Sequence, residues 1–194
     1  MNESGTVREV IERHRMESGI AADGGASDRW VVLRLGRIPM PFPNSSARRK
    51  VIALHDVNHL VAGVSTGNVG EAEISAWELA RGGCGKYLAA WGLDLAGMLM
   101  GFVWPIHVLR AFSTGRTMRN AYAFDADEVL DMDLAKLRQV LTRPDRSYFS
   151  SIVGSAALFI GCLILAVPVG AAFLFMVILS LPIWALTKDE GGVV

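Results

Sequence analysis

Residues 151–187 read SIVGSAALFIGCLILAVPVGAAFLFMVILSLPIWALT, thirty-seven consecutive positions without one charged side chain. At about 1.5 Å per residue, a straight helix of this length would measure roughly 55 Å, far more than the ~30 Å hydrocarbon core of a bilayer. Pro168 removes a helical hydrogen-bond donor near the middle, and Gly170 permits a turn conformation. The run is therefore predicted to divide into two spans of roughly 17 to 20 residues, forming a transmembrane helical hairpin over 147–187.

Basic residues flank this run on both sides. Arg143 and Arg146 precede it, Lys188 follows it, and the predicted turn has no charge. Positive residues favour the cytoplasmic side, so we expect a membrane protein with both of these ends, and its soluble domain, in the cytoplasm. The charged amino terminus, which lacks the apolar core of a secretory signal, agrees with that expectation. The competing interpretation is a buried hairpin in a soluble protein, but so long an uncharged stretch is hard to bury in so small a domain.

The composition limits what else the chain can be. Its 194 residues suffice for one domain of ordinary size with an appendage. Nineteen basic residues balance nineteen acidic ones, so there is no basic field to bind nucleic acid. The two cysteines, Cys84 and Cys162, indicate neither a disulfide framework nor a cysteine metal site. We expect a flexible lead-in at 1–28, a helical domain at 29–146, the hairpin, and a tail at 188–194.

Periodicity and capping residues predict helices through most of the middle domain. One helix would run from N-caps at 44–46 to Gly63, and the next would end at the glycine pair 82–83. An amphipathic helix capped by Asp125 would close the domain at 142. The fold class predicted is therefore all-α, a helical bundle with a C-terminal transmembrane helical hairpin.

Two segments are less regular. The stretch 88–112 is nearly apolar and rich in glycine, but Asp94 disfavours a third membrane span, so a helix that packs closely or lines a groove for an apolar ligand is expected. The segment RWVVLRLGRI at 29–38 fits either a strand or a helical turn. The prolines that follow, in PMPFPN at 39–44, are expected to break any regular element.

The stretch HDVNHLVAGVSTGNVGE, residues 55–71, contains two of the four histidines in the chain. On a helix, His55 and His59 stand one turn apart on the same face. Glu71 returns in the first turn of the following helix and can face them, while Asp56 can either ligate the same ion or support an imidazole from behind. Two imidazoles with one or two carboxylates suit Zn²⁺ or Fe²⁺ and leave a position for water or substrate.

The other polar side chains of this region have competing interpretations. Glu78 lies seven residues after Glu71 and is either a supporting acid or a solvated glutamate. Glu73 is expected to be exposed, and His14 to lie on the surface among charges. His107, in an apolar helix, is expected to be a core histidine. An isolated pair of histidines at this spacing is often a packing accident, so Glu71 is what favours a metal site.

His55, Asp56 and His59, then eleven residues, then Glu71, with Gly63 and Gly70 between them, resemble the metal-binding signature of the coenzyme Q biosynthesis protein 4 family. The likeness covers 36–142. It includes the approach segment GRIPMPFPNSSARRKVIALHD, the WELA at 77–80, the apolar helix ending near WPIHVLRA, and the closing helix.

The resemblance implies an all-helical, peripheral-membrane protein that binds a divalent metal through His55, Asp56, His59 and Glu71. Zinc is the metal that it favours. It also implies a role in ubiquinone synthesis. The activity implied is loss of the ring carboxylate of a polyprenylated 4-hydroxybenzoate-type intermediate, with oxygenation at that carbon. The partners implied are this isoprenoid lipid, the membrane and other quinone-biosynthesis proteins.

The chain departs from the family in three places. Much of the family's amino-terminal helical region is missing or replaced, and the apolar run at the carboxyl end is an addition. The basic residue that usually follows the glutamate is also absent, with Ser75 and Ala76 near its place. Two other functions compete with a decarboxylase: a non-catalytic scaffold that binds quinone precursors and organises the biosynthetic complex, and a metal phosphohydrolase. The phosphohydrolase would need further histidines, and only His14 and His107 remain.

Overall fold

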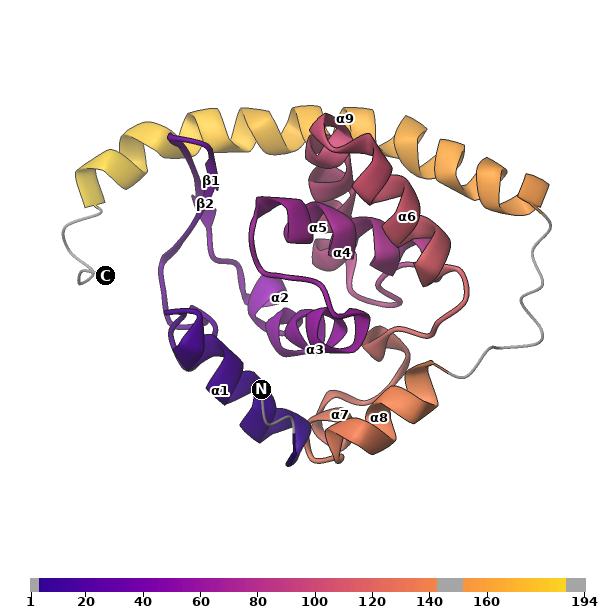
Figure 1. The fold of residues 1–194 in the computed structure, drawn as a ribbon. Coiled ribbons are helices and arrows are strands. Elements are labelled where there is room, and N and C mark those ends of the chain that lie inside the picture. The colour runs from indigo at the N-terminus through magenta and orange to yellow at the C-terminus, as the bar shows by residue number, and fades with distance from the viewer. Residues whose placement is uncertain (1–3, 143–151, 188–194) are drawn as a thin grey trace.

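The computed structural model describes residues 4–142 and 152–187. Its elements, in chain order, are α1 (Val7–Glu17), β1 (Trp30–Leu35), β2 (Ile38–Pro43), α2 (Ser46–Arg49), α3 (Ile52–Ala62), α4 (Asn68–Ala80), α5 (Leu88–Met100), η1 (Gly101–Val103), α6 (Pro105–Gly115), η2 (Ala121–Ala123), α7 (Ala126–Leu130), α8 (Leu134–Leu141) and α9 (Ile152–Thr187). Helix α9 runs along one side of the molecule, and α1, α7 and α8 lie on the opposite side (Figure 1). The fold is mostly helical, as predicted, with one small sheet.

The sheet corrects the sequence prediction for the proline segment. Strand β1 pairs antiparallel with β2, from Trp30 opposite Pro43 to Leu35 opposite Ile38, around a tight turn at Gly36, whose φ is 61°. The three prolines of β2 occupy alternate positions, so the N–H groups that they lack would all point to the same side of the strand. A two-stranded ribbon can leave that side open, which is why the prolines do not break the strand.

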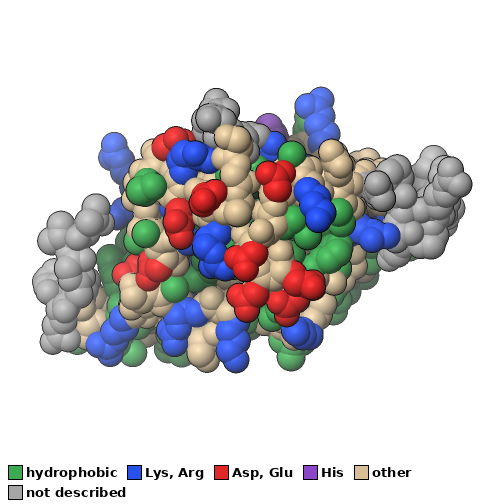
Figure 2. Space-filling model, turned by 90° about the horizontal axis from the view of Figure 1, so that it is seen from below, with side chains coloured by type: hydrophobic (Ala, Val, Ile, Leu, Met, Phe, Trp, Pro, Cys, Tyr) green, Lys and Arg blue, Asp and Glu red, His purple; other side chains and the backbone are tan. Residues whose placement is uncertain are grey.

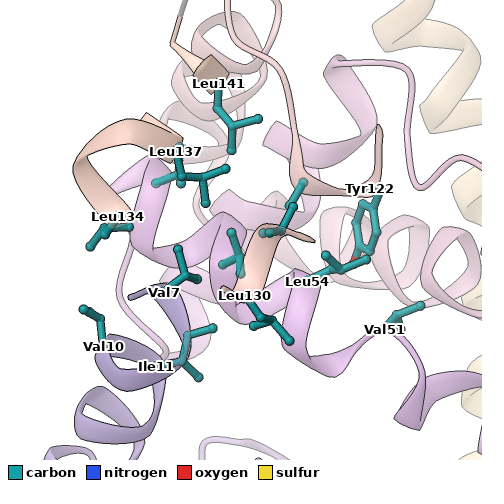
Figure 3. Close-up of a cluster of buried hydrophobic side chains, with 14 of the residues drawn as sticks. Val7, Val10, Ile11, Val51, Leu54, Tyr122, Leu130, Leu134, Leu137 and Leu141 are labelled. Atoms are coloured by element: carbon teal, nitrogen blue, oxygen red, sulfur yellow. The ribbon is translucent and has the colours of Figure 1, made fainter. Parts of the chain in front are cut away.

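The first hydrophobic core joins the amino-terminal helix to the closing helices (Figure 3). Val7, Val10 and Ile11 of α1 are buried against Leu54 of α3 and against α7 and α8. Residues 7–17 thus form a helix packed into the domain, within the segment 1–28 that the sequence analysis expects to be a flexible lead-in. The predicted closing helix is two short helices, because both Asp125 and Asp133 cap a helix start with their side chains.

A second core holds α9 against the domain. It contains buried residues of α4, α5 and α6 together with Cys162 and Ala166 of α9. Residues 162, 166, 170, 173, 177 and 180 recur at three- and four-residue spacing and so share one face of α9. Within this set, Cys162, Ala166, Val177 and Ser180 are buried, whereas the opposite side of the helix exposes large apolar residues such as Ile160, Ile164, Val167 and Leu174.

The predicted hairpin is wrong: residues 152–187 form one continuous helix that includes Pro168 and Pro182. Gly170 does not turn the chain. A Cβ atom there would lie 2.5 Å from Cδ2 of Leu99, so the glycine lets α5 approach α9 closely. Pro168 points away from the domain and removes one helical hydrogen bond, which this packing tolerates. By length and composition, α9 is able to cross a membrane.

Candidate metal site

The two helices that hold the candidate ligands are joined by a turn that depends on two glycines. Gly63 ends α3 in the left-handed conformation, with φ 68°, and the chain reverses into α4 after Gly67. At Gly70, a Cβ atom would lie 1.8 Å from the carbonyl oxygen of Ser65, so a larger residue would push the turn off the helix. These local constraints bring the first turn of α4, with Glu71, against the histidine face of α3.

His55, His59 and Glu71 converge. The two Nε2 atoms lie 3.2 Å apart, and each is 3.4 Å from a carboxylate oxygen of Glu71. Two ligand atoms that are each about 2.1 Å from a tetrahedral zinc ion lie roughly 3.4 Å from one another. The three side chains therefore have the separations of one face of a tetrahedral coordination shell, and this group could hold a metal ion.

The far sides of both imidazoles are occupied by acceptors. Nδ1 of His55 lies 3.3 Å from Oε1 of Glu78, and Nδ1 of His59 lies 3.2 Å from the backbone carbonyl of Val64. A proton on each Nδ1 satisfies these contacts and leaves the lone pair of each Nε2 directed at the shared point. This tautomer is the one that metal-bound histidines of this type require.

Glu78 is the hub of a buried network behind the site. Its side chain is fully buried and accepts a hydrogen bond of 2.6 Å from Nδ2 of Asn58. Its carboxyl group also shares a hydrogen bond with Asp94, which accepts another from the thiol of Cys84. Burial first, and then the charge of Glu78, raise the pKa of Asp94 well above its usual range, so Asp94 is held as the neutral acid. Sequence reasoning had left Glu78 open between a supporting and a solvated role, and the structure shows the first.

Without a metal, the site contains an ion pair. Burial opposes a charge on His55, but Glu78 and Glu71 outweigh it and raise the pKa of the imidazole well above its usual range. Burial likewise would raise the pKa of Glu71, yet hydrogen bonds to His55 and His59 lower it. A cation at the centre of the three side chains is therefore electrostatically favoured, whether a proton or a metal ion.

Asp56, the fourth predicted ligand, lies outside the converging group. Its carboxylate oxygen accepts a hydrogen bond of 2.8 Å from Nε of Arg15, and a second guanidinium nitrogen contacts the same oxygen. The reason is geometric, because Asp56 follows His55 by one residue and so points about 100° away around α3. Arg15 comes from α1, whose packing against α3 the sequence did not predict.

One of the other two histidines differs from expectation. His107 is not a core residue: its side chain is 51% exposed, and its Nδ1 lies 2.7 Å from Glu73. His14, expected on the surface, is half-buried and lines the same cavity as the candidate site.

The site opens on a cavity of about 440 Å³. His55, His59 and Glu71 lie in its wall. Apolar residues of β1, β2, α5 and α9 also line it, among them Val31, Val32, Phe42, Leu93, Met100 and Phe173. The last of these belongs to α9, and its ring packs edge-on against Phe42 at 5.2 Å between centroids. The cavity thus joins a polar metal-type site to the apolar carboxyl-terminal helix, and its size is that of an ordinary ligand pocket.

Arginine side chains contribute positive charge to the same cavity. Arg48 of α2 lines it, and its nearest polar partner among the described residues is an amide oxygen, Oδ1 of Asn44 at 3.2 Å. Arg48 is half-buried, and this burial lowers the pKa of its guanidinium, although Asp56 and Glu71 favour its charge. Arg34 of β1 also lines the cavity. A partly desolvated guanidinium without a carboxylate at ion-pair distance suits an anionic ligand.

Sequence reasoning missed most of the surroundings of the site. Arg15 comes from a segment with no motif of its own, and Arg48 lies in the approach segment without having been singled out there. Asp94 was noted only as an obstacle to membrane insertion. The seven-residue interval between Glu71 and Glu78 was the one signal that pointed to the network. In comparisons with known proteins, no family model, curated protein or solved structure matches this chain.

Proposed function

We propose that this protein binds a divalent metal ion through His55, His59 and Glu71 and acts on an isoprenoid lipid with an acidic aromatic head group, as a decarboxylase of ubiquinone biosynthesis. The observation that carries the proposal is the convergence of two Nε2 atoms and one carboxylate, 3.2–3.4 Å apart, at a cavity that also reaches α9. The sequence resemblance described above supplies the pathway and the substrate class.

The number of ligands favours catalysis over a purely structural site. Structural zinc sites use four protein ligands, whereas three protein ligands leave a coordination position for water or substrate. A bound divalent metal would act as a Lewis acid that polarises the ring carboxylate. Zn²⁺ and Fe²⁺ both fit a donor set of two imidazoles and one carboxylate.

Different residues of the cavity bind different parts of the proposed substrate. Arg48 provides a guanidinium for the carboxylate of the head group, in place of the basic residue that the family has after its glutamate. The apolar wall, including Phe42 and Phe173, accommodates the start of the isoprenoid tail. The neutral Asp94 and the Glu78 carboxylate hold His55 in position behind the site.

Metal content of the purified protein tests the ligand assignment. We expect wild type to retain about one metal ion per chain, and the double variant His59→Ala, Glu71→Ala to lose it. The matched control is His107→Ala with Glu73→Ala, which removes another histidine and glutamate of α4 and α6 that contact each other away from the cavity. Equal metal content in all three proteins would overturn the metal site.

The lipid composition of a deletion strain tests the pathway. We expect ubiquinone to fall and a carboxylated, prenylated precursor to accumulate. Restoring the gene with the His59→Ala, Glu71→Ala variant should leave that precursor high while the other biosynthetic proteins remain assembled. A scaffold would give the opposite pattern, in which assembly fails together with the metal site. An unchanged lipid profile on deletion would remove the pathway assignment.

A further inference from the structure

Helix α9 contacts the domain at both of its ends. Near its start, Nε of Arg116 donates a hydrogen bond to Oγ of Ser155 at 3.3 Å. Near its end, Nε1 of Trp30 donates to Oγ1 of Thr187 at 3.0 Å. These two contacts are separated by thirty-two residues of helix, or roughly 48 Å. The domain therefore lies along α9 over a length greater than the thickness of the ~30 Å hydrocarbon core.

Contacts between these ends are continuous. The ring of Phe159 packs against Phe112 of α6 at 5.0 Å, Gly170 fits Leu99 of α5, and Phe173 packs against Phe42 of β2. If α9 crossed the bilayer perpendicular to the membrane plane, these neighbouring elements would lie inside the bilayer as well.

The side of α9 that faces away from the domain is apolar along its length. Ile160, Val167 and Leu174, spaced by seven residues, are each more than half exposed. Neighbouring elements extend this surface: Leu35 and Ile38 in the turn of the ribbon, and Phe102, Val103, Ile106 and Leu109 of η1 and α6. We call these residues, with the exposed side of α9, the lipid face.

The face of the molecule that lies away from α9 is charged. Figure 2 shows acidic and basic side chains spread over the side that lies away from α9. Around the ribbon turn, by contrast, the charged residues are Arg34 and Arg37, which flank Leu35 and Ile38. Arginines beside apolar residues extend their stems over the interface and favour anionic headgroups. The molecule thus has one apolar side rimmed by arginine and one charged side.

We propose that the protein is monotopic: the lipid face is embedded in one leaflet of the bilayer, with α9 lying parallel to the membrane plane rather than crossing it. Both ends of α9 then lie on the same side of the membrane as the domain, although no hairpin connects them. The cavity wall includes Phe173 of the embedded helix itself, so an isoprenoid tail has a short route from the bilayer to the site. This arrangement does not depend on the metal or on the reaction proposed above.

Spin-label depth measurements test the proposal. The variants Ile160→Cys, Val167→Cys and Leu174→Cys, made with Cys84→Ala and Cys162→Ala, are labelled in the full chain and reconstituted into phosphatidylethanolamine–phosphatidylglycerol vesicles. Accessibility to oxygen and to a water-soluble nickel complex gives the depth of each label. We expect similar depths at all three positions, and an aqueous signal from the control Lys136→Cys on α8. A crossing helix would instead separate the first and third labels by up to about 21 Å along the membrane normal.

A second measurement needs no cysteine replacement. Fluorescent-protein and alkaline-phosphatase reporters are fused in turn to the amino and carboxyl ends of the wild-type chain in a bacterial host. We expect fluorescence and no phosphatase activity at both ends. Opposite results at the two ends, graded label depths, or α9 labels exposed to water would each overturn the monotopic arrangement.

Discussion

Nδ1 of His55 lies 3.3 Å from Oε1 of Glu78, a carboxylate fully buried behind the candidate metal site. A proton on Nδ1 satisfies this contact and leaves Nε2 free for the proposed metal ion, and the negative charge of Glu78 increases the basicity of the imidazole. Glu78 is thus proposed as a positioning residue: it would act on the metal through His55, from the opposite side of the ring.

The first prediction concerns Glu78→Gln. The substitution keeps the shape of the side chain but removes its charge, so we expect metal affinity to fall by about 10- to 100-fold while the fold is retained. Competition with a fluorescent zinc chelator measures the affinity, and circular dichroism checks the fold. Glu73→Gln, on the same helix but paired with His107, is the control and should bind metal like wild type. Unchanged affinity in Glu78→Gln would show that its contact with His55 does not tune the site.

The second prediction is a pH dependence that comes from Asp94. Its pKa in the folded protein is raised by burial and by Glu78, whereas an unfolded aspartate titrates near ~3.9. The folded protein therefore binds the proton of Asp94 more tightly than the unfolded chain does. The stability that this gives is fully present below the pKa of Asp94 in the unfolded chain, and it is lost as pH rises through the pKa of Asp94 in the folded protein. For the metal-free protein in detergent, the free energy of unfolding should decrease from about pH 4 toward higher pH.

Asp94→Asn should remove the part of this dependence that comes from Asp94, because an amide stays neutral at every pH, while the decrease caused by the raised pKa of His55 remains in both proteins. Thermal unfolding across the pH range with a chelator present measures the difference between the two proteins. Asp131→Asn is the control, since Asp131 is an exposed partner of Arg8. If wild type and Asp94→Asn show parallel pH profiles, Asp94 is ionised in the folded state and the assigned network is wrong.

The sequence predicted the centre of the site better than its surroundings. The His-x-x-x-His spacing and the two glycines of the turn are local, so helical geometry alone places His55, His59 and Glu71 on facing helices. Asp56, predicted as a fourth ligand, instead contacts Arg15, which lies 41 residues away in α1. No local pattern reports a contact of that kind.

The hairpin prediction failed for a related reason. Pro168 and Gly170 together form a plausible local break, but tertiary packing decides between a break and a continuous helix. Leu99 of α5 occupies the space that the absence of a side chain at Gly170 provides, and the contacts along α9 keep the helix in one piece. The proline strand was misjudged in the same way, since pairing with β1 determines which N–H groups are needed.

The third prediction separates substrate binding from metal binding. Arg48→Gln removes a charge-assisted hydrogen bond, worth about 1.5–3 kcal/mol, so affinity for a carboxylated substrate should fall by roughly 10- to 150-fold. A geranylated 4-hydroxybenzoate is the probe, and calorimetry on metal-loaded protein measures its binding. The metal content should not change. Arg8→Gln, which alters an arginine on the far side of α1, should bind the probe normally; the same loss in both variants would contradict a specific role for Arg48.

The fourth prediction tests why α9 is straight. Gly170→Val places a side chain within 2.5 Å of Leu99, so we expect overpacking to destabilise the protein by about 1–3 kcal/mol, measured by thermal unfolding in detergent. Gly161→Val is the matched control: apart from its own chain neighbours and the adjacent backbone of α9, no atom of the described residues lies within 4 Å of a Cβ built at that position. Adding Leu99→Ala to Gly170→Val makes room for the new side chain and should recover part of the loss. If Gly170→Val and Gly161→Val were equally stable, α5 would not be packed against α9 at Gly170, and the reason given for the continuous helix would be wrong.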